Sequence, residues 1–321
     1  MIRAIIKAAA AAMVTTVTAT GCTGGRSAVV PGSADTITSS NDLTLPLDSY
    51  DLDAQERAVV QRARGALLRT CMTHYGFKVA LPAQTPVLYP RNAAFLGWLG
   101  AKQVSRYGYS GPPGQLLEEA SAANGLRPFP PIAGLQGAVF AGEVETVGGK
   151  RVPPGGCNAA AEKLLSRRAV STDGSSPAPA FADRKLGSFA ADAAERAYAD
   201  DRLRAADQAW SACMRASGYV YDRPSGARED PRWATRENEP AGATEKKTAT
   251  ADEKCRSATN YIGIRKMLYT DHQQRIIRDE ESTLRWIAGL LRARLAMAHE
   301  VLDDRSGQLQ SRWLRSLDEA T

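Results

Sequence analysis

Five cysteines are the residues of this 321-residue sequence whose type and spacing point most directly to chemistry. Cys22 lies alone near the N-terminus, and the other four are spread over the rest of the chain: Cys71, Cys157, Cys213 and Cys255. Four cysteines in an exported chain are typical of two disulfides, for which three connectivities exist. Two disulfides are therefore expected, and the number of cysteines alone leaves their pairing open.

The N-terminus has the three-part layout of an export signal. Two basic residues precede an uncharged run that is shorter than the about 20 residues a membrane-spanning helix needs. Three small residues, Ala19–Gly21, then lead directly to Cys22. This arrangement resembles the lipobox of bacterial lipoproteins, in which the cysteine is acylated and becomes the mature N-terminus, although Ala19 stands where leucine is commonest. We expect a signal peptide over 1–21 and lipidation of Cys22, with simple cleavage to a secreted protein as the alternative.

The histidines give little support for a metal or catalytic site. His74, His272 and His299 lack the spacing of a zinc-binding motif, and we expect no metal and no cofactor. His74 follows Cys71 by three residues, which would allow a thiolate and imidazole pair, but a structural role is favoured. His272 and Glu280 interrupt an apolar helical stripe and could line a polar pocket, with a solvated break in the helix as the alternative. The catalytic residues, if there are any, are unknown from the sequence.

One aromatic run and the overall charge bear on binding partners. Arg106, Tyr107 and Tyr109 lie in a turn-rich run and could contact a ligand or partner, the alternative being loop packing. Lys and Arg number 41 against 35 Asp and Glu, a formal net charge of +6. This charge is compatible with proximity to anionic lipid or cell-wall polymer. The sequence has no basic stripe with interleaved aromatics, so no nucleic-acid partner is expected.

Two helix ends share one pattern, and the repeat suggests how the cysteines pair. Residues 71–77 read C-M-T-H-Y-G-F and residues 213–219 read C-M-R-A-S-G-Y. Each copy is followed by a stretch with proline and glycine and then by a second cysteine that should open a helix. We interpret this as a diverged internal duplication, with chance similarity of two alanine-rich helices as the alternative. The duplication predicts disulfides between Cys71 and Cys157 and between Cys213 and Cys255.

Apolar periodicity predicts a mainly α fold. The first helix should begin at Asp53, whose spacing to Glu56 is that of a capping box, and should end at Gly76. A second helix is expected over 190–217, ending at Gly218 in the same way.

The C-terminal part is expected to form a long helix. Thr250 and Glu253 have the spacing of another capping box, and an apolar stripe continues from there for about 50 residues. Ser306 and Gly307 mark a break, after which a short amphipathic helix should follow.

The remaining segments are expected to connect these helices. Composition predicts a flexible tether, an inter-half linker and an irregular loop, over 22–48, 171–188 and 222–250 respectively. Within the first half we expect two helices and one extended pair, over 91–104, 115–123 and 137–147 respectively.

The expected architecture is an elongated helical body of two diverged, disulfide-stapled halves, 49–170 and 189–321, the second ending in the long helix. The lipobox-like start, the 71–77 helix end, the run Arg106-Tyr107-Gly108 and the segment Val152–Cys157 resemble a family of uncharacterised exported proteins of actinobacteria. The resemblance implies origin and location only, because no activity of that family can be carried over.

These expectations favour a non-enzymatic envelope lipoprotein, lipid-anchored on the outer face of the cytoplasmic membrane, that binds a protein partner or a cell-wall component. An extracytoplasmic enzyme is one alternative, for example a cell-wall hydrolase that uses Glu280 with His272. A solute-binding lipoprotein is another, but such proteins usually need two α/β lobes, and the sequence lacks the alternating buried strands.

Overall fold

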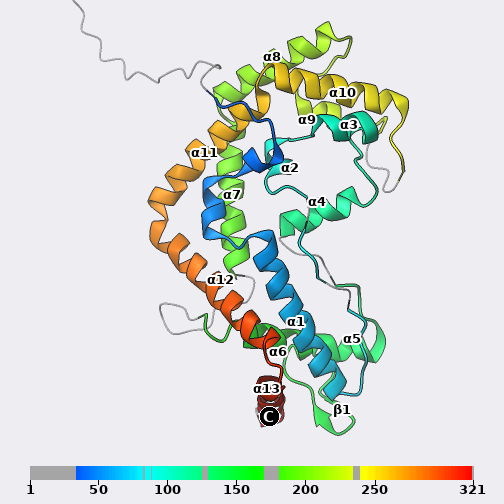
Figure 1. Cartoon of the computed structure of the whole chain (residues 1–321), viewed down its shortest axis with the longest axis vertical. Helices are drawn as coiled ribbons and strands as arrows, with labels where there is room; N and C mark the ends of the chain where they lie inside the picture. Colours follow the sequence, from blue (N-terminus) through cyan, green and yellow to red (C-terminus); the bar gives the residue numbers. More distant parts are fainter. Residues whose placement is uncertain are drawn as a thin grey trace, which may run out of the picture. The chain divides into compact units, whose positions relative to one another are not determined.

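The computed structural model describes residues 34–81, 84–87, 89–124, 129–169, 181–233 and 239–319. All of them belong to one compact unit, Pro31–Thr321. Within these residues the fold is mainly α, as predicted, with thirteen α-helices, two short 3-10 helices and one antiparallel hairpin (Figure 1).

The described residues form the following secondary-structure elements. The 3-10 helices are η2 (Ser40–Leu43) and η3 (Pro46–Tyr50), and the hairpin strands are β1 (Thr146–Val147) and β2 (Lys150–Arg151). The α-helices in chain order are α1 (Ala54–His74), α2 (Ala93–Leu96), α3 (Ala101–Tyr107), α4 (Gln115–Asn124), α5 (Gly134–Ala141), α6 (Gly156–Leu165), α7 (Phe181–Tyr198), α8 (Asp201–Ala216), α9 (Pro224–Arg228), α10 (Ala243–Ala258), α11 (Tyr261–Asp279), α12 (Glu281–Leu302) and α13 (Gln308–Glu319).

Helix α1 begins with the predicted capping box. The Asp53 carboxylate accepts the Glu56 N–H at 2.8 Å, and the Glu56 carboxylate accepts the Asp53 N–H at 3.0 Å. Two of the backbone donors that a helix start leaves without partners are thereby satisfied.

The repeated pattern is a helix C-cap of the Schellman type in both copies. Gly76 and Gly218 adopt φ values of +82° and +86°, which favour glycine because it lacks a Cβ. The next N–H, of Phe77 or Tyr219, donates back to the methionine carbonyl at 2.9 Å in each copy. The methionine of each pattern is fully buried. The same seven-residue sequence pattern therefore ends each helix next to a hydrophobic core.

The cysteines pair as the duplication predicted. Cys71 is bonded to Cys157, and Cys213 is bonded to Cys255. The expectation that each second cysteine opens a helix is confirmed only for Cys157, at the start of α6. Cys255 instead lies near the end of α10, so the similarity of the copies does not extend to the second cysteine.

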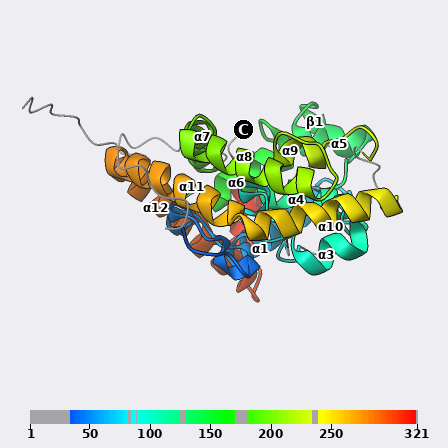
Figure 2. The same cartoon turned by 90° about the horizontal axis from the view of Figure 1, so that it is seen from above.

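Two hydrophobic cores are formed, and each contains one disulfide. The first core takes its buried side chains mainly from α1, α6, α7 and α12, with Trp313 of α13. The second core takes them mainly from α2, α8, α10 and α11, with Val104 of α3. Helix α12 therefore packs on α1, and α3 packs on α10 (Figures 1 and 2). Each core therefore combines helices from both halves of the sequence.

The folded part of the chain begins earlier than predicted, within the segment 22–48 that was expected to be a tether. Leu43, Leu45 and Leu47 fall in its last residues, yet all three are buried, and they join both cores through η2 and η3. Burying a leucine side chain stabilises the fold by about 1.5–3 kcal/mol, which outweighs the polar composition of the segment. Residues 22–33 of the expected tether lie outside the described residues.

Several expected boundaries in the middle of the chain are wrong. The helix over 190–217 is two helices, because Asp200 caps α8 by accepting the Arg202 N–H at 2.9 Å. Residues 181–188 of the expected linker form the first turns of α7, and 171–180 lie outside the described residues. Of the region expected to be extended, 137–147, residues 137–141 belong to helix α5 and only Thr146–Val147 form a strand, β1. The region 91–104 contains α2 and part of α3.

The C-terminal helical region is confirmed, but it is divided. Its first helix, α10, begins at Ala243, inside the expected loop, and the Thr250 hydroxyl donates to the Lys246 carbonyl at 2.7 Å instead of capping a helix. Asn260, with φ of +49°, separates α10 from α11, and Glu280 separates α11 from α12. The final helix, α13, follows Gly307 as predicted. In the described part of the chain, no helix combines the length and the apolar character needed to cross a membrane.

Candidate functional site

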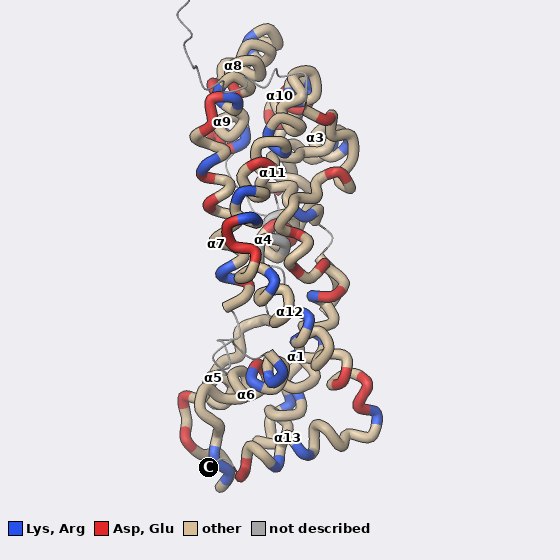
Figure 3. Tube along the Cα trace, turned by 90° about the vertical axis from the view of Figure 1, so that its left-hand side faces the viewer, with Lys and Arg blue, Asp and Glu red and all other residues tan. Residues whose placement is uncertain are grey.

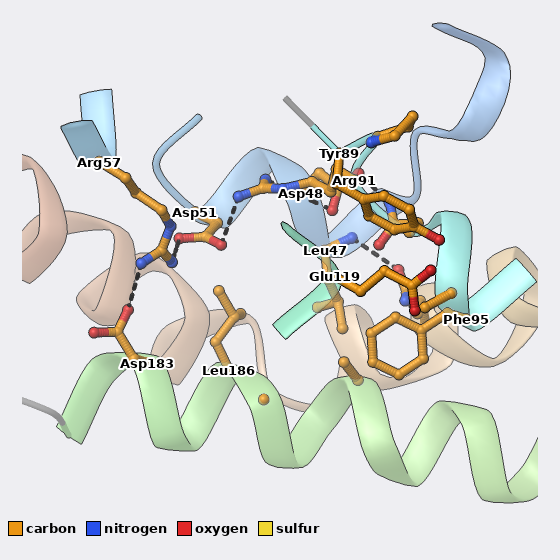
Figure 4. A pocket seen from close by; sticks show the side chains of 16 residues that line it. Leu47, Asp48, Asp51, Arg57, Tyr89, Arg91, Phe95, Glu119, Asp183 and Leu186 are labelled. Carbon is orange, nitrogen blue, oxygen red and sulfur yellow. Dashed lines mark hydrogen bonds and ion pairs between the residues drawn. The ribbon is translucent and has the colours of Figure 1, made fainter. Parts of the chain in front are cut away.

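A pocket of about 190 Å³ lies where the two cores meet, and it is the best candidate for a functional site (Figure 4). Six elements and the segment before α2 contribute to its lining. The polar lining residues are Asp48, Asp51, Arg57, Tyr89, Arg91, Asn92, Glu119, Asp183 and Gln273, and the apolar ones are Leu47, Pro90, Ala94, Phe95, Leu186, Gly187 and Ala190.

One side of the pocket is a chain of ion pairs that joins η3, α1 and α7. The Arg57 guanidinium contacts the Asp51 carboxylate and lies 3.0 Å from Oδ1 of Asp183. Arg91 donates to the other oxygen of Asp51 at 2.8 Å and to the Leu52 carbonyl at 2.6 Å. Both guanidinium groups are held by carboxylates before any ligand arrives, so this side of the pocket is preorganised.

Asp48 is less completely neutralised than its neighbours. Its Oδ2 accepts hydrogen bonds from the Leu45 N–H and the Asn92 side chain, each at 2.8 Å. Within the described residues, its Oδ1 has only a 3.7 Å ion pair with Arg91. Burial raises the pKa of the Asp48 carboxyl above its ordinary value, although these hydrogen bonds and Arg91 act in the opposite direction. The carboxylate therefore keeps acceptor capacity toward the pocket.

The other side of the pocket is held through Glu119. Its carboxylate accepts from Gln115 at 2.9 Å and from the Arg228 guanidinium at 2.8 Å. Burial, together with the negative charge of Glu119, raises the pKa of the Tyr89 hydroxyl. Tyr89 is therefore a neutral hydroxyl at this end of the pocket.

Two buried arginines of the second core hold the α2 wall of the pocket from behind. Arg265 donates to the Phe95 carbonyl, and Arg256 donates to the Gly97 carbonyl at 2.7 Å. Gly97 has φ of +72°, and a Cβ there would lie 2.8 Å from the Arg256 guanidinium. Only glycine fits this close approach without strain, so Gly97 sets the position of Phe95.

Asp252 is the centre of the polar network behind that wall. It is fully buried and accepts from Trp210 Nε1 at 2.7 Å, from the Tyr109 hydroxyl at 2.9 Å and from Arg256 at 2.7 and 2.9 Å. Burial alone would lower the pKa of Arg256, but the Asp252 carboxylate outweighs this and raises it. Arg256 therefore keeps its charge and is hydrogen-bonded to Asp252, which is the condition under which a buried ion pair is tolerated.

The aromatic run predicted from the sequence packs beside this network. Tyr109 is buried and stacks on Trp233 with ring centroids 5.8 Å apart, and the Ser110 N–H and hydroxyl both donate to Glu245 at 2.8 Å. The Arg106 guanidinium lies 5.0 Å from the ring centroid of Tyr107. None of these residues lines the 190 Å³ pocket, so the run mainly joins the end of α3 to α10.

His272 and Glu280 are not brought together. His272 is buried in α11 with Nε2 3.8 Å from an Asp200 oxygen, and burial and Arg275 lower its pKa, so it is neutral near pH 7. Glu280 lies half-buried at the break before α12. Eight residues separate the two, which is about 12 Å along a helix. Neither lines the pocket, although Gln273, the residue after His272, does.

The remaining predicted residues have structural surroundings. Cys71 is in a disulfide, so a thiolate paired with His74 is ruled out while that bond is formed. His74 instead contacts Asp318 of α13 at 3.1 Å. Cys22 lies outside the described residues. Across the described ranges, no group of three or more His, Cys, Asp or Glu is placed to hold a metal ion.

The two disulfides indicate an oxidising compartment outside the cytoplasm. Comparison of the chain with protein-family models, with curated proteins and with solved structures finds no match. The fold defines a mainly helical protein with two disulfides.

Sequence reasoning missed the pocket because its residues come from segments that are far apart. Asp48 lay in the expected tether, and Asp183 lay in the expected linker, where charged residues are usually solvated. One signal was available, because Leu43, Leu45 and Leu47 occupy every second position and so indicate a segment packed on a core.

Proposed function

We propose that this chain is a non-enzymatic, lipid-anchored binding protein on the outer face of the cytoplasmic membrane, and that the pocket binds a component of the cell wall. The observation that carries the proposal is the preorganised pocket, in which ion pairs between η3, α1 and α7 fix the side chains before binding. Fixing these groups in advance reduces the entropy that binding would otherwise cost.

The N-terminal residues and the two disulfides both support this location. The export signal and the lipobox-like residues before Cys22 favour acylation at that cysteine. The two disulfides fit the compartment that such a protein enters. An anchored protein with its folded part outside the membrane lies next to the wall polymer.

Binding is favoured over catalysis because the carboxylates of the pocket already have partners. Asp51, Asp183 and Glu119 each form an ion pair with an arginine. The hydrolase alternative rests on His272 and Glu280, which lie about 12 Å apart along the helix. Acidic and basic residues are also interspersed along α7, so this helix does not present a surface of one charge (Figure 3).

Filling the pocket should abolish binding to the wall. Gly187 of α7 lines the pocket, and a Cβ at this position would meet nothing within 4 Å. Gly187→Leu should therefore fold normally, since leucine is also the better helix former. We expect at least a tenfold loss in the amount of mature protein that sediments with insoluble peptidoglycan.

Gly289→Leu is the matched control. Gly289 is exposed on α12, has equally open space around its Cβ and does not line the pocket. This variant should sediment like the wild type. Equal sedimentation of the Gly187→Leu variant and the wild type would remove the pocket from the proposed function.

A further inference from the structure

The size of the pocket limits what can enter it. Its volume of about 190 Å³ is below the about 300–1,000 Å³ of pockets that take a drug-sized ligand. The pocket suits a single short group, such as one side chain, and not a long stretch of polymer. The ligand group must therefore be short, and its chemistry should match the walls.

The charges of the lining are not balanced. Four carboxylates, those of Asp48, Asp51, Glu119 and Asp183, face two guanidinium groups, those of Arg57 and Arg91. Arg228 pairs with Glu119 but does not line this pocket, so one negative charge remains in excess. The excess is best assigned to Asp48, whose Oδ1 is 3.7 Å from its nearest guanidinium nitrogen among the described residues. A cation would complete this set, whereas an anion would be repelled.

The remaining lining suits the apolar part of such a ligand. Leu47 and Leu186 are buried side chains that line the pocket together with Ala190. Tyr89 and Phe95 add two aromatic rings, and Figure 4 shows both toward the end of the pocket where Glu119 lies. Phe95 is 42% exposed, so its ring is accessible. Aromatic faces attract cations as well as apolar groups.

We infer that the group bound here is an alkylammonium, that is, a primary amine carried by a short apolar chain. The ammonium contacts Oδ1 of Asp48, and the chain lies against the leucines of the pocket and the ring of Phe95. This inference rests on the proposed function, because it names the chemical group of the wall component that the pocket takes. The same group occurs in free amines and in lysine-like side chains of peptides.

Titration calorimetry with three probes tests the charge of the ligand. The probes are n-pentylamine, Nα-acetyl-lysine amide and the same amide acetylated at Nε, which is neutral. We expect the first two to bind and Nε-acetylation to weaken binding at least tenfold. Tighter binding of the lysine amide than of pentylamine assigns the group to a peptide, and the reverse order assigns it to a free amine. Equal binding of the charged and acetylated amides would overturn the inference.

Two variants test the position of the ammonium. Asp48→Asn keeps the shape of the side chain and removes its charge, and it should weaken binding of the lysine amide at least fivefold. Asp192→Asn removes the same charge from the exposed Arg196 pair of α7, outside the pocket, and should leave binding within twofold. Because Asp48 also accepts bonds from Leu45 and Asn92, Phe95→Leu provides a second test at an exposed position, with an expected loss of about threefold. Unchanged affinity in both pocket variants would contradict the inference.

Failure of the inference and failure of the proposed function give different results. If peptidoglycan sediments the protein in a Gly187-dependent manner but neither amine binds, the alkylammonium assignment is wrong and the proposed function stands. If neither the amines nor peptidoglycan bind, both are wrong.

Discussion

Replacing Asp252 with alanine should lower the free energy of unfolding by about 3–5 kcal/mol, because it leaves the Arg256 guanidinium buried without its carboxylate. Arg256 is only 3% exposed, so water cannot replace the lost partner. Trp210 and Tyr109 lose the same acceptor. Urea unfolding followed by circular dichroism measures the effect.

The control for this prediction is an exposed ion pair with the same spacing. Asp192 and Arg196 are also four residues apart, and Asp192→Ala should leave stability almost unchanged. The double variant Asp252→Leu with Arg256→Met should recover part of the loss, since it removes the buried charge as well. A loss of less than about 1 kcal/mol for Asp252→Ala would show that the network does not hold the second core.

The second large effect concerns the Cys71–Cys157 disulfide. It joins residues 86 positions apart, and closing a loop of that length stabilises the fold by about 4–5 kcal/mol in the chain-entropy model. Both cysteines are fully buried in the first core. The variant in which both are alanine should therefore lose about 3–5 kcal/mol of unfolding free energy in urea unfolding without reductant.

The other disulfide serves as the matched comparison. Cys213 and Cys255 are 42 positions apart, about half the separation, so the entropic term is about 0.6 kcal/mol smaller. Replacing this pair by alanine should cost slightly less. A clearly larger cost for the shorter loop would mean that local packing, and not loop closure, sets the contribution of these bonds.

Features set by neighbouring residues could be predicted from the sequence. The capping box of Asp53 and Glu56 and the C-caps at Gly76 and Gly218 depend on contacts within one helical turn, and all of them form as expected. The disulfide pairing followed from the repeat of a local pattern, because two similar helix ends carry the two first cysteines.

Features that depend on contacts between distant segments could not be predicted from the sequence. The break at Asp200 falls in an alanine-rich region where helix propensity is high, and the cap and the packing of α7 on α11 decide it. The exchange of helices between the halves places α12 on α1, which no local pattern indicates. For the same reason the pocket brings together Asp48, Glu119 and Gln273, which the sequence separates widely.

We propose that the chain works outside the cytoplasm on a lipid anchor, and the proposed binding of a wall component depends on this location. The most direct test is mass spectrometry of non-reduced peptides from protein extracted from the membrane fraction of its own host. The account predicts a diacylglyceryl group on Cys22 as the mature N-terminus, with Cys71 bonded to Cys157 and Cys213 bonded to Cys255. An unmodified Cys22 together with free thiols at Cys71 and Cys213 would contradict it.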